Sequence, residues 1–235
     1  HLFPVGEVNG SHGVYRPGGS ALNSGQAGSL RAAQFIAHKY TGPAMDAEAV
    51  KQCCGAQIEA AIAFGMAAFD RSGEEIDLKA ERKELGVRMS ERGANIRSLS
   101  GVTKGLKENW LQQQRVEEAV ISKPADLKQL YRLRDLLVSQ QVYLEAIADY
   151  IRRGGASRGS YLIYDPKGTK PLPCLPELFT FSLEDSWMSG QIQEVEYHKE
   201  GCKCFFRPVR PIPEEDSWFE KVWRDWRENA YYQSI

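Results

Sequence analysis

The apolar positions follow the helical period over most of the chain. The clearest run is the segment 124–153, where apolar side chains recur at every third or fourth position: Leu127, Leu130, Tyr131, Leu133, Leu137, Leu144, Ile147 and Ile151. This spacing predicts one long helix, with Pro124 in its first turn and Gly154-Gly155 as its stop. Weaker versions of the pattern predict helices over 20–40, 46–69, 74–97 and 101–120. We expect the segments 74–97, 101–120 and 124–153 to pack as an antiparallel bundle around their apolar stripes.

The pattern of apolar positions changes after residue 160, from helical spacing to short runs. Short apolar runs predict strands over 161–164, 178–183, 191–197 and 202–209, and the last two form a hairpin that turns at 199–201. A final short helix is predicted from large apolar side chains at helical spacing: Trp218, Phe219, Val222, Trp223 and Trp226. That helix either packs on the body of the protein or presents its apolar face to a partner.

The first residues suggest a binding loop. The apolar run 2–5 predicts a strand, Gly6-Glu7 follows it, and a glycine-rich loop carrying His12 and Arg16 leads into the helix that opens near Ser20. Glycines let backbone N–H groups approach a ligand closely, and the dipole at a helix N-terminus favours negative charge. Such a loop suits a phosphate- or cofactor-bearing ligand, although many glycine-rich turns only change the direction of the chain.

Composition narrows the classes of function. The chain has 235 residues and a net charge of -1, so nothing in its charge favours nucleic acid or an anionic membrane as a partner. The apolar stretch 60–69 is far shorter than the roughly 20 residues that span a bilayer. The chain opens on the predicted strand without an initiator Met, and we expect a carboxy-terminal fragment whose upstream part is missing.

The five cysteines do not predict a metal site. Cys53 and Cys54 are adjacent on a predicted helix and point in different directions, whereas Cys202 and Cys204 share one face of a predicted strand. Neither pair has further His or Cys residues at the spacing of a zinc site or of an iron–sulfur cluster. We therefore expect reduced thiols in a cytoplasmic protein, with membrane association through a partner as the alternative.

The loop also carries a resemblance to a known family. The stretch 6–22 resembles the carboxy-terminal FAD-contacting motif of the fumarate reductase/succinate dehydrogenase flavoproteins, which reads Gly-Glu, a spacer, His-Gly-Ala-Asn-Arg-Leu-Gly-Gly-Asn-Ser-Leu and a long helix. His12-Gly13, Arg16, Gly18-Gly19 and Leu22 match that motif in identity and spacing. Three later segments resemble the family more weakly and in the same order: 88–98, Ser157-Arg158-Gly159 and 206–210.

The resemblance implies roles for individual residues. Arg16 stands at the position of the arginine that binds a substrate carboxylate beside flavin N5, and the planar fork of a guanidinium suits that task. Glu7 stands where the family binds the ribityl chain of FAD. Gly18, Gly19 and the helix start at Ser20, Ala21 and Leu22 stand where backbone N–H groups face the flavin. His12 either orients the loop or contacts the substrate.

The resemblance therefore implies an FAD-dependent oxidoreductase that moves hydride between flavin N5 and a carboxylate-bearing small molecule. It also implies domain limits: the end of an FAD-binding domain over 1–42, a helical domain over 43–156 and a β-hairpin and helix extension over 157–235. Together with the periodicity, this predicts a mostly helical α+β fold.

Two points stay open at the level of sequence. Tyr15 and Pro17 depart from the motif on either side of Arg16, so a relative with another substrate, similar to adenylylsulfate reductase or aspartate oxidase, is an alternative to a fumarate or succinate enzyme. The upstream FAD-binding half would carry the dinucleotide-binding glycines and the other catalytic groups, so we expect the chain alone to be inactive. The other class of function is a non-catalytic helical interaction module.

Overall fold

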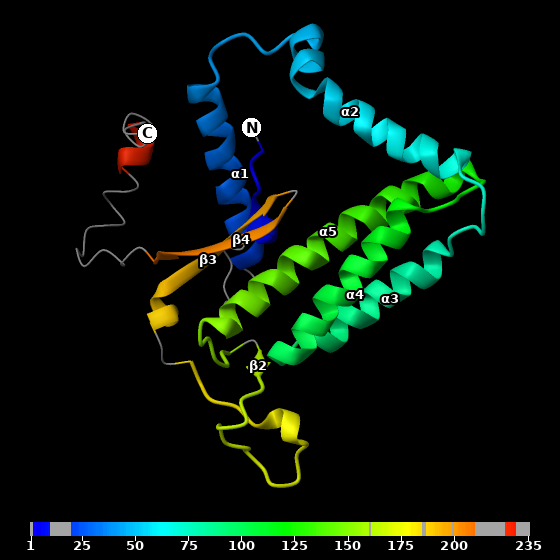
Figure 1. The fold of residues 1–235 in the computed structure, drawn as a ribbon. Helices are drawn as coiled ribbons and strands as arrows, with labels where there is room; N and C mark the ends of the chain where they lie inside the picture. Colours follow the sequence, from blue (N-terminus) through cyan, green and yellow to red (C-terminus); the bar gives the residue numbers. More distant parts are fainter. Residues whose placement is uncertain are drawn as a thin grey trace. The chain divides into compact units, whose positions relative to one another are not determined.

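The computed structural model describes residues 2–9, 20–159, 161–184, 187–198, 200–209 and 224–228 (Figure 1). The chain divides into two compact units, residues 1–52 with 210–235 and residues 53–209. The expected limits at 42 and 156 differ from this division and stay a prediction.

The first unit is built on helix α1 (Ser20–Lys39), with the 3₁₀ turn η1 (Gly6–Asn9) lying against it. The strand predicted over residues 2–5 is not present: the described structure assigns them to no strand, and Leu2 is 91% exposed. A strand needs a partner for its backbone groups, and the described strands pair only with one another. Residues 224–227 are helical, and the Trp226 indole donates to Gln34 Oε1 on α1 at 2.8 Å. The rest of the predicted terminal helix, including Trp218, Phe219, Val222 and Trp223, lies outside the described residues.

The second unit is built around the predicted three-helix bundle (Figure 1). The bundle consists of α3 (Leu78–Arg92), α4 (Leu99–Glu117) and α5 (Pro124–Arg152), all in contact with one another and joined by short connections. Helix α2 (Ala47–Asp70) begins in the first unit, and its last turns pack on the bundle. A Cβ at Gly65 would lie only 2.7 Å from the Tyr131 hydroxyl, so α2 and α5 approach closely because this residue is glycine. None of the described helices is long and apolar enough to cross a membrane.

The predicted helix over 74–97 is shorter than expected. The Asp77 carboxylate accepts hydrogen bonds from the backbone of Lys79 and Ala80, so α3 starts at Leu78. It ends at Gly93, whose backbone N–H bonds back to Met89. Residues 96 and 97, expected to be helical, instead form strand β1 (Ile96–Arg97), which pairs in parallel with β2 (Leu162–Ile163).

The predicted hairpin is present, and one other predicted strand is not. β3 (Gln191–His198) and β4 (Gly201–Pro208) pair antiparallel, from Gln191 opposite Pro208 to His198 opposite Gly201, and both contact α5. The segment 178–183 instead contributes part of the 3₁₀ turn η2 (Glu177–Phe179) and two isolated bridges, Thr169–Phe181 and Ser157–Leu183. A further turn, η3 (Trp187–Gly190), leads into β3. The described structure is thus mostly helical with two small sheets, an α+β fold.

Two apolar clusters fill the bundle. One joins the end of α2 to α4 and the first half of α5; the buried members are Phe64, Ala68, Val116, Ala119, Ile121, Leu130, Leu133 and Leu137. The other lies between the start of α4 and the second half of α5; its buried members are Val102, Leu144, Ile147 and Ala148. Along α5, the apolar stripe changes cluster at Gln140, which is itself buried.

Candidate functional site

The segment that carries the motif runs antiparallel to α1. The rings of Phe3 and Phe35 lie 5.7 Å apart between centroids. Farther along, Val5 lies against Gly28, and Gly6 lies against Gly25, where a Cβ on Gly25 would sit 3.9 Å from the Gly6 Cα. The segment and α1 therefore run in opposite directions, and later residues of the segment lie closer to the start of α1. Gly6 has a φ of 75°, a conformation that glycine adopts without strain, whereas a Cβ at Gly25 or Gly28 would meet the segment at ordinary van der Waals distance.

This antiparallel run brings Glu7 toward the amino-terminal end of α1. Glu7 lies on η1 and is exposed, directly after the Gly6–Gly25 contact. Ser20, Ala21 and Leu22 form the first turn of α1, and this turn contains no acidic side chain. The first backbone N–H groups of a helix have no partner within the helix, so this end of α1 is suited to bind negative charge.

The remaining predicted site residues, His12, Arg16, Gly18 and Gly19, lie outside the described residues. The structure therefore brings together the Glu7 turn and the start of α1, and the roles assigned to the loop between them stay predictions. Leu22 is 77% exposed, so its side chain contributes nothing to the packing of α1.

Two of the weaker landmarks meet in space. Arg97 lies in the segment 88–98 and pairs with Ile163 across the β1–β2 sheet, while the Ser157 hydroxyl accepts a hydrogen bond from Ile163 N at 2.8 Å. The Arg97 guanidinium also lies over the Tyr161 ring, 4.2 Å from its centroid. The segments around Arg97 and Ser157 are thus parts of one structural unit.

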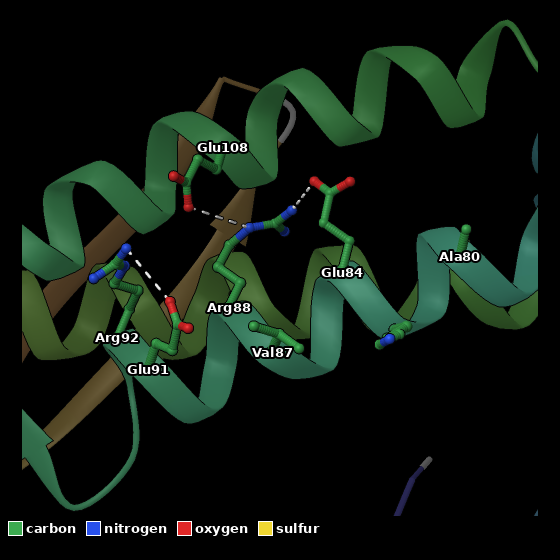
Figure 2. Close-up of a pocket in the computed structure, with 8 residues that line it drawn as sticks. Ala80, Glu84, Val87, Arg88, Glu91, Arg92 and Glu108 are labelled. Atoms are coloured by element: carbon green, nitrogen blue, oxygen red, sulfur yellow. Dashed lines mark hydrogen bonds and ion pairs between the residues drawn. The ribbon is translucent and has the colours of Figure 1, made fainter.

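A groove between α3 and α4 contains several charged side chains (Figure 2). It encloses about 530 Å³ and is lined by Lys83, Glu84, Arg88, Glu91, Arg92 and Glu108, with Ala80 and Val87. We call it the α3–α4 groove. Arg88 lies 2.6 Å from Glu84 and 3.8 Å from Glu108, and Arg92 lies 3.5 Å from Glu91. Its arginines are therefore paired with carboxylates of the groove itself.

Arg88 is the centre of a buried polar layer. It is only 3% exposed, and its guanidinium donates to Gln140 Oε1 on α5 at 2.7 Å and to Gln112 Oε1 on α4 at 2.8 Å. Each glutamine also donates back to α3: Gln140 to Leu85 O at 2.9 Å, and Gln112 to Glu81 O at 2.7 Å. The layer lies between the two apolar clusters and joins all three helices, which indicates that it sets their register.

Comparison with known proteins adds to this geometry. No protein-family model matches the sequence, and no curated protein matches it. The chain shares its fold with solved structures. One is a mutant of Escherichia coli quinol fumarate reductase FrdA, with 14% sequence identity, a TM-score of 0.55 and 82% of this chain covered. Another is the Mycobacterium smegmatis Sdh1 complex in its apo form, with 18% identity, a TM-score of 0.60 and 92% covered.

The similarity concerns the fold, and it covers only part of each of these longer chains. This chain covers 29% of the FrdA chain and 35% of the Sdh1 chain, so it spans about a third of their length. At this level of identity, the match gives the fold of the region; substrate and activity need other support.

The cysteines are free thiols in the described structure. Cys202 and Cys204 occupy alternate positions of β4, opposite Tyr197 and Val195. Burial, with a smaller contribution from the nearby carboxylate of Asp149, raises the pKa of Cys204 to about 11. Among the described residues, no three His, Cys, Asp or Glu side chains come together as a metal site.

Sequence reasoning missed the Arg88 layer, although the sequence contains a sign of it. Gln140 falls in the α5 stripe between Leu137 and Leu144, and Asn109 and Gln112 fall in the α4 stripe between Val102 and Val116. Polar residues at three positions of apolar stripes predict a shared hydrogen-bonded layer, because each polar group needs a partner when buried.

Proposed function

We propose that this chain is part of an FAD-dependent oxidoreductase of the fumarate reductase/succinate dehydrogenase type, acting on a carboxylate-bearing small molecule. The observation that carries the proposal is the fold likeness to quinol fumarate reductase FrdA and to the Sdh1 complex over 82% and 92% of this chain. The motif residues 6–22, which resemble the FAD-contacting motif of that family, support it independently of the fold.

The described end of α1 fits a flavin. A bound flavin would supply hydride transfer at N5 and would carry negative charge on its ring when reduced. The first turn of α1 has no carboxylate that would repel this charge, and its N–H groups, which have no partner within the helix, favour it.

Each motif residue then has a task. Backbone N–H groups at Ser20, Ala21 and Leu22 stabilise negative charge, and the Glu7 carboxylate accepts a hydrogen bond from a cofactor hydroxyl. Gly18 and Gly19 allow close backbone approach, Arg16 holds the substrate carboxylate through two parallel hydrogen bonds, and His12 orients the loop. The groups that complete the site would come from an upstream FAD-binding half of the same protein.

The first test is the visible spectrum of the native protein, purified with whatever sequence naturally precedes His1. We expect flavin absorbance that bleaches with dithionite. Colourless, cooperatively folded protein would contradict the proposal and favour the non-catalytic helical interaction module.

Replacement of Arg16 separates substrate binding from cofactor binding. In the flavin-containing protein, Arg16→Ala should lower kcat/KM at least a hundredfold while the flavin content stays unchanged. Arg152→Ala, an exposed arginine at the end of α5, is the control and should leave the rate unchanged. An Arg16→Ala enzyme as fast as its parent would refute the role assigned to Arg16.

A further inference from the structure

A second groove lies along the bundle, between α3 and α5. It encloses about 330 Å³ and has a floor of leucines, Leu78, Leu133 and Leu136. Three cations, Lys79, Arg82 and Arg132, stand along it together with one carboxylate, Asp126. We call it the α3–α5 groove.

The cations of this groove are not neutralised. None of Lys79, Arg82 and Arg132 makes an ion pair within 4.0 Å among the described residues, and all three are exposed. A cationic rim over an apolar floor is complementary to a ligand with leucine-like side chains on one face and carboxylates beside them.

The shape of the groove favours a helical segment over a small molecule. Its α5 side runs from Asp126 to Leu136, through residues at helical spacing that share one face. At 1.5 Å per residue this distance is about 15 Å, the length of nearly three turns of a docked helix. A small dicarboxylate is less than half as long and would span only part of this side of the groove.

We propose that the α3–α5 groove binds an acidic, leucine-bearing helical segment of a partner protein. The leucines of that segment cover the half-buried Leu78 and Leu136, beside the buried Leu133, and its carboxylates pair with Lys79, Arg82 and Arg132. This mode of binding places an amphipathic helix in a hydrophobic groove, with charge setting its orientation. It is independent of the proposed redox activity, since no residue of the groove belongs to the motif.

The test is direct binding to a designed probe. The probe is a fluorescein-labelled 16-residue peptide with leucine at spacings of three and four and glutamate at most other positions, titrated against the full chain by fluorescence anisotropy. We expect saturable binding that weakens at least tenfold in R82E/R132E. The matched control K51E/K107E reverses two exposed lysines elsewhere, with the same change in net charge, and should keep the affinity within twofold.

Further probes separate the alternatives. A peptide of the same composition with its leucines scattered around the helix should bind at least tenfold more weakly, because it cannot cover the floor. Equal weakening in both charge variants, or no saturable binding of the probe, would overturn the proposal. Displacement of the probe by millimolar succinate would replace the helical partner with a small-anion site, and equally tight binding of a single-stranded oligonucleotide would also overturn it.

Discussion

The two grooves beside α3 have similar residues, but their cations differ in whether they are paired with carboxylates. In the α3–α4 groove, Arg88 lies beside Glu84 and Glu108 and is almost completely buried. In the α3–α5 groove, Arg82 comes from the same helix and is exposed, without an ion pair among the described residues. The difference follows from burial: a cation removed from water needs partners, while an exposed cation is solvated and remains available to a ligand.

Carboxylates beside the α3–α4 groove also pair with an arginine at the protein surface. Arg115 on α4 donates to Glu81 at 3.0 Å and to Glu84 at 2.7 Å, and its hydrogen bond to the Glu81 carboxylate raises the pKa of Arg115. Glu81 and Glu84 therefore link the surface arginine to the buried layer, since Glu81 also accepts from Gln112 and Glu84 from Arg88. We infer that the α3–α4 groove stabilises the fold and that the α3–α5 groove serves binding.

The largest difference should appear when one arginine is removed from each groove. Arg88→Met leaves the buried Gln112 Oε1 without a donor and Gln140 Oε1 with Asn109 alone, and it removes the charged partner of both. We expect it to lower the free energy of unfolding by about 3–5 kcal/mol. Arg82→Met on the same helix should change it by less than about 0.5 kcal/mol. Urea denaturation monitored by circular dichroism measures both; equal losses would show that the two grooves do not differ in this way.

A smaller effect should follow from the glutamines. Gln140→Leu removes an acceptor from Arg88, and we expect a loss of about 1–3 kcal/mol in the same assay. Its control is Gln129→Leu, an exposed residue of the α3–α5 groove, which should be close to neutral.

Replacing the layer as a unit sharpens this prediction. R88M/Q112L/Q140L should recover stability relative to R88M alone, because buried polar groups no longer lack partners. A further loss in the triple variant would mean that the layer contributes more than hydrogen-bond satisfaction.

Salt should weaken binding at the α3–α5 groove and leave the contribution of Arg88 to stability nearly unchanged. Raising NaCl from 0.05 to about 0.5 M shortens the Debye length severalfold, so binding of the acidic probe to the exposed α3–α5 groove should weaken about tenfold. The stability difference between the parent and R88M should stay nearly constant, since Arg88 is shielded from solvent ions. A large salt dependence of that stability difference would place the Arg88 pairs at the solvent surface.

The same dependence of charge on burial predicts a small kinetic effect at the cysteines. With a pKa raised to about 11, Cys204 is about 0.1% thiolate at pH 8, so iodoacetamide should modify it far more slowly than the exposed Cys53, Cys54 and Cys174. Its rate should rise as the pH increases toward 11. Mass spectrometry of the peptides measures the rates, and a Cys204 as reactive at pH 8 as Cys53 would contradict the burial.

Local patterns predicted the elements whose residues interact within one segment. The helix over 124–153 is α5 to within one residue, because Pro124 suits a first turn and the stripe to Ile151 is regular. The hairpin of β3 and β4 also followed from alternation and a glycine turn, and Gly201 has a φ of 128°.

Elements that depend on distant residues were not predicted. β1 and β2 are two residues long and pair across more than sixty positions, which no local pattern records. Arg88 was assigned to no stripe because a charged residue is normally solvated; its burial depends on acceptors from two other helices. For the candidate site, sequence indicated the Glu7 turn and the start of α1, which the structure brings near one another, while the roles of His12 and Arg16 rest on the resemblance alone.

We propose that the motif of residues 6–22 serves hydride transfer to a carboxylate-bearing substrate. Reoxidation of the reduced flavin by such a substrate is the direct test of this proposal. The native protein, with its natural preceding sequence, is reduced with dithionite under anaerobic conditions and mixed rapidly with fumarate. We predict that flavin absorbance returns as succinate forms in equal amount, and that Arg16→Ala slows this return at least a hundredfold. Reduced flavin that stays bleached with fumarate and with other unsaturated or keto carboxylates would contradict the account.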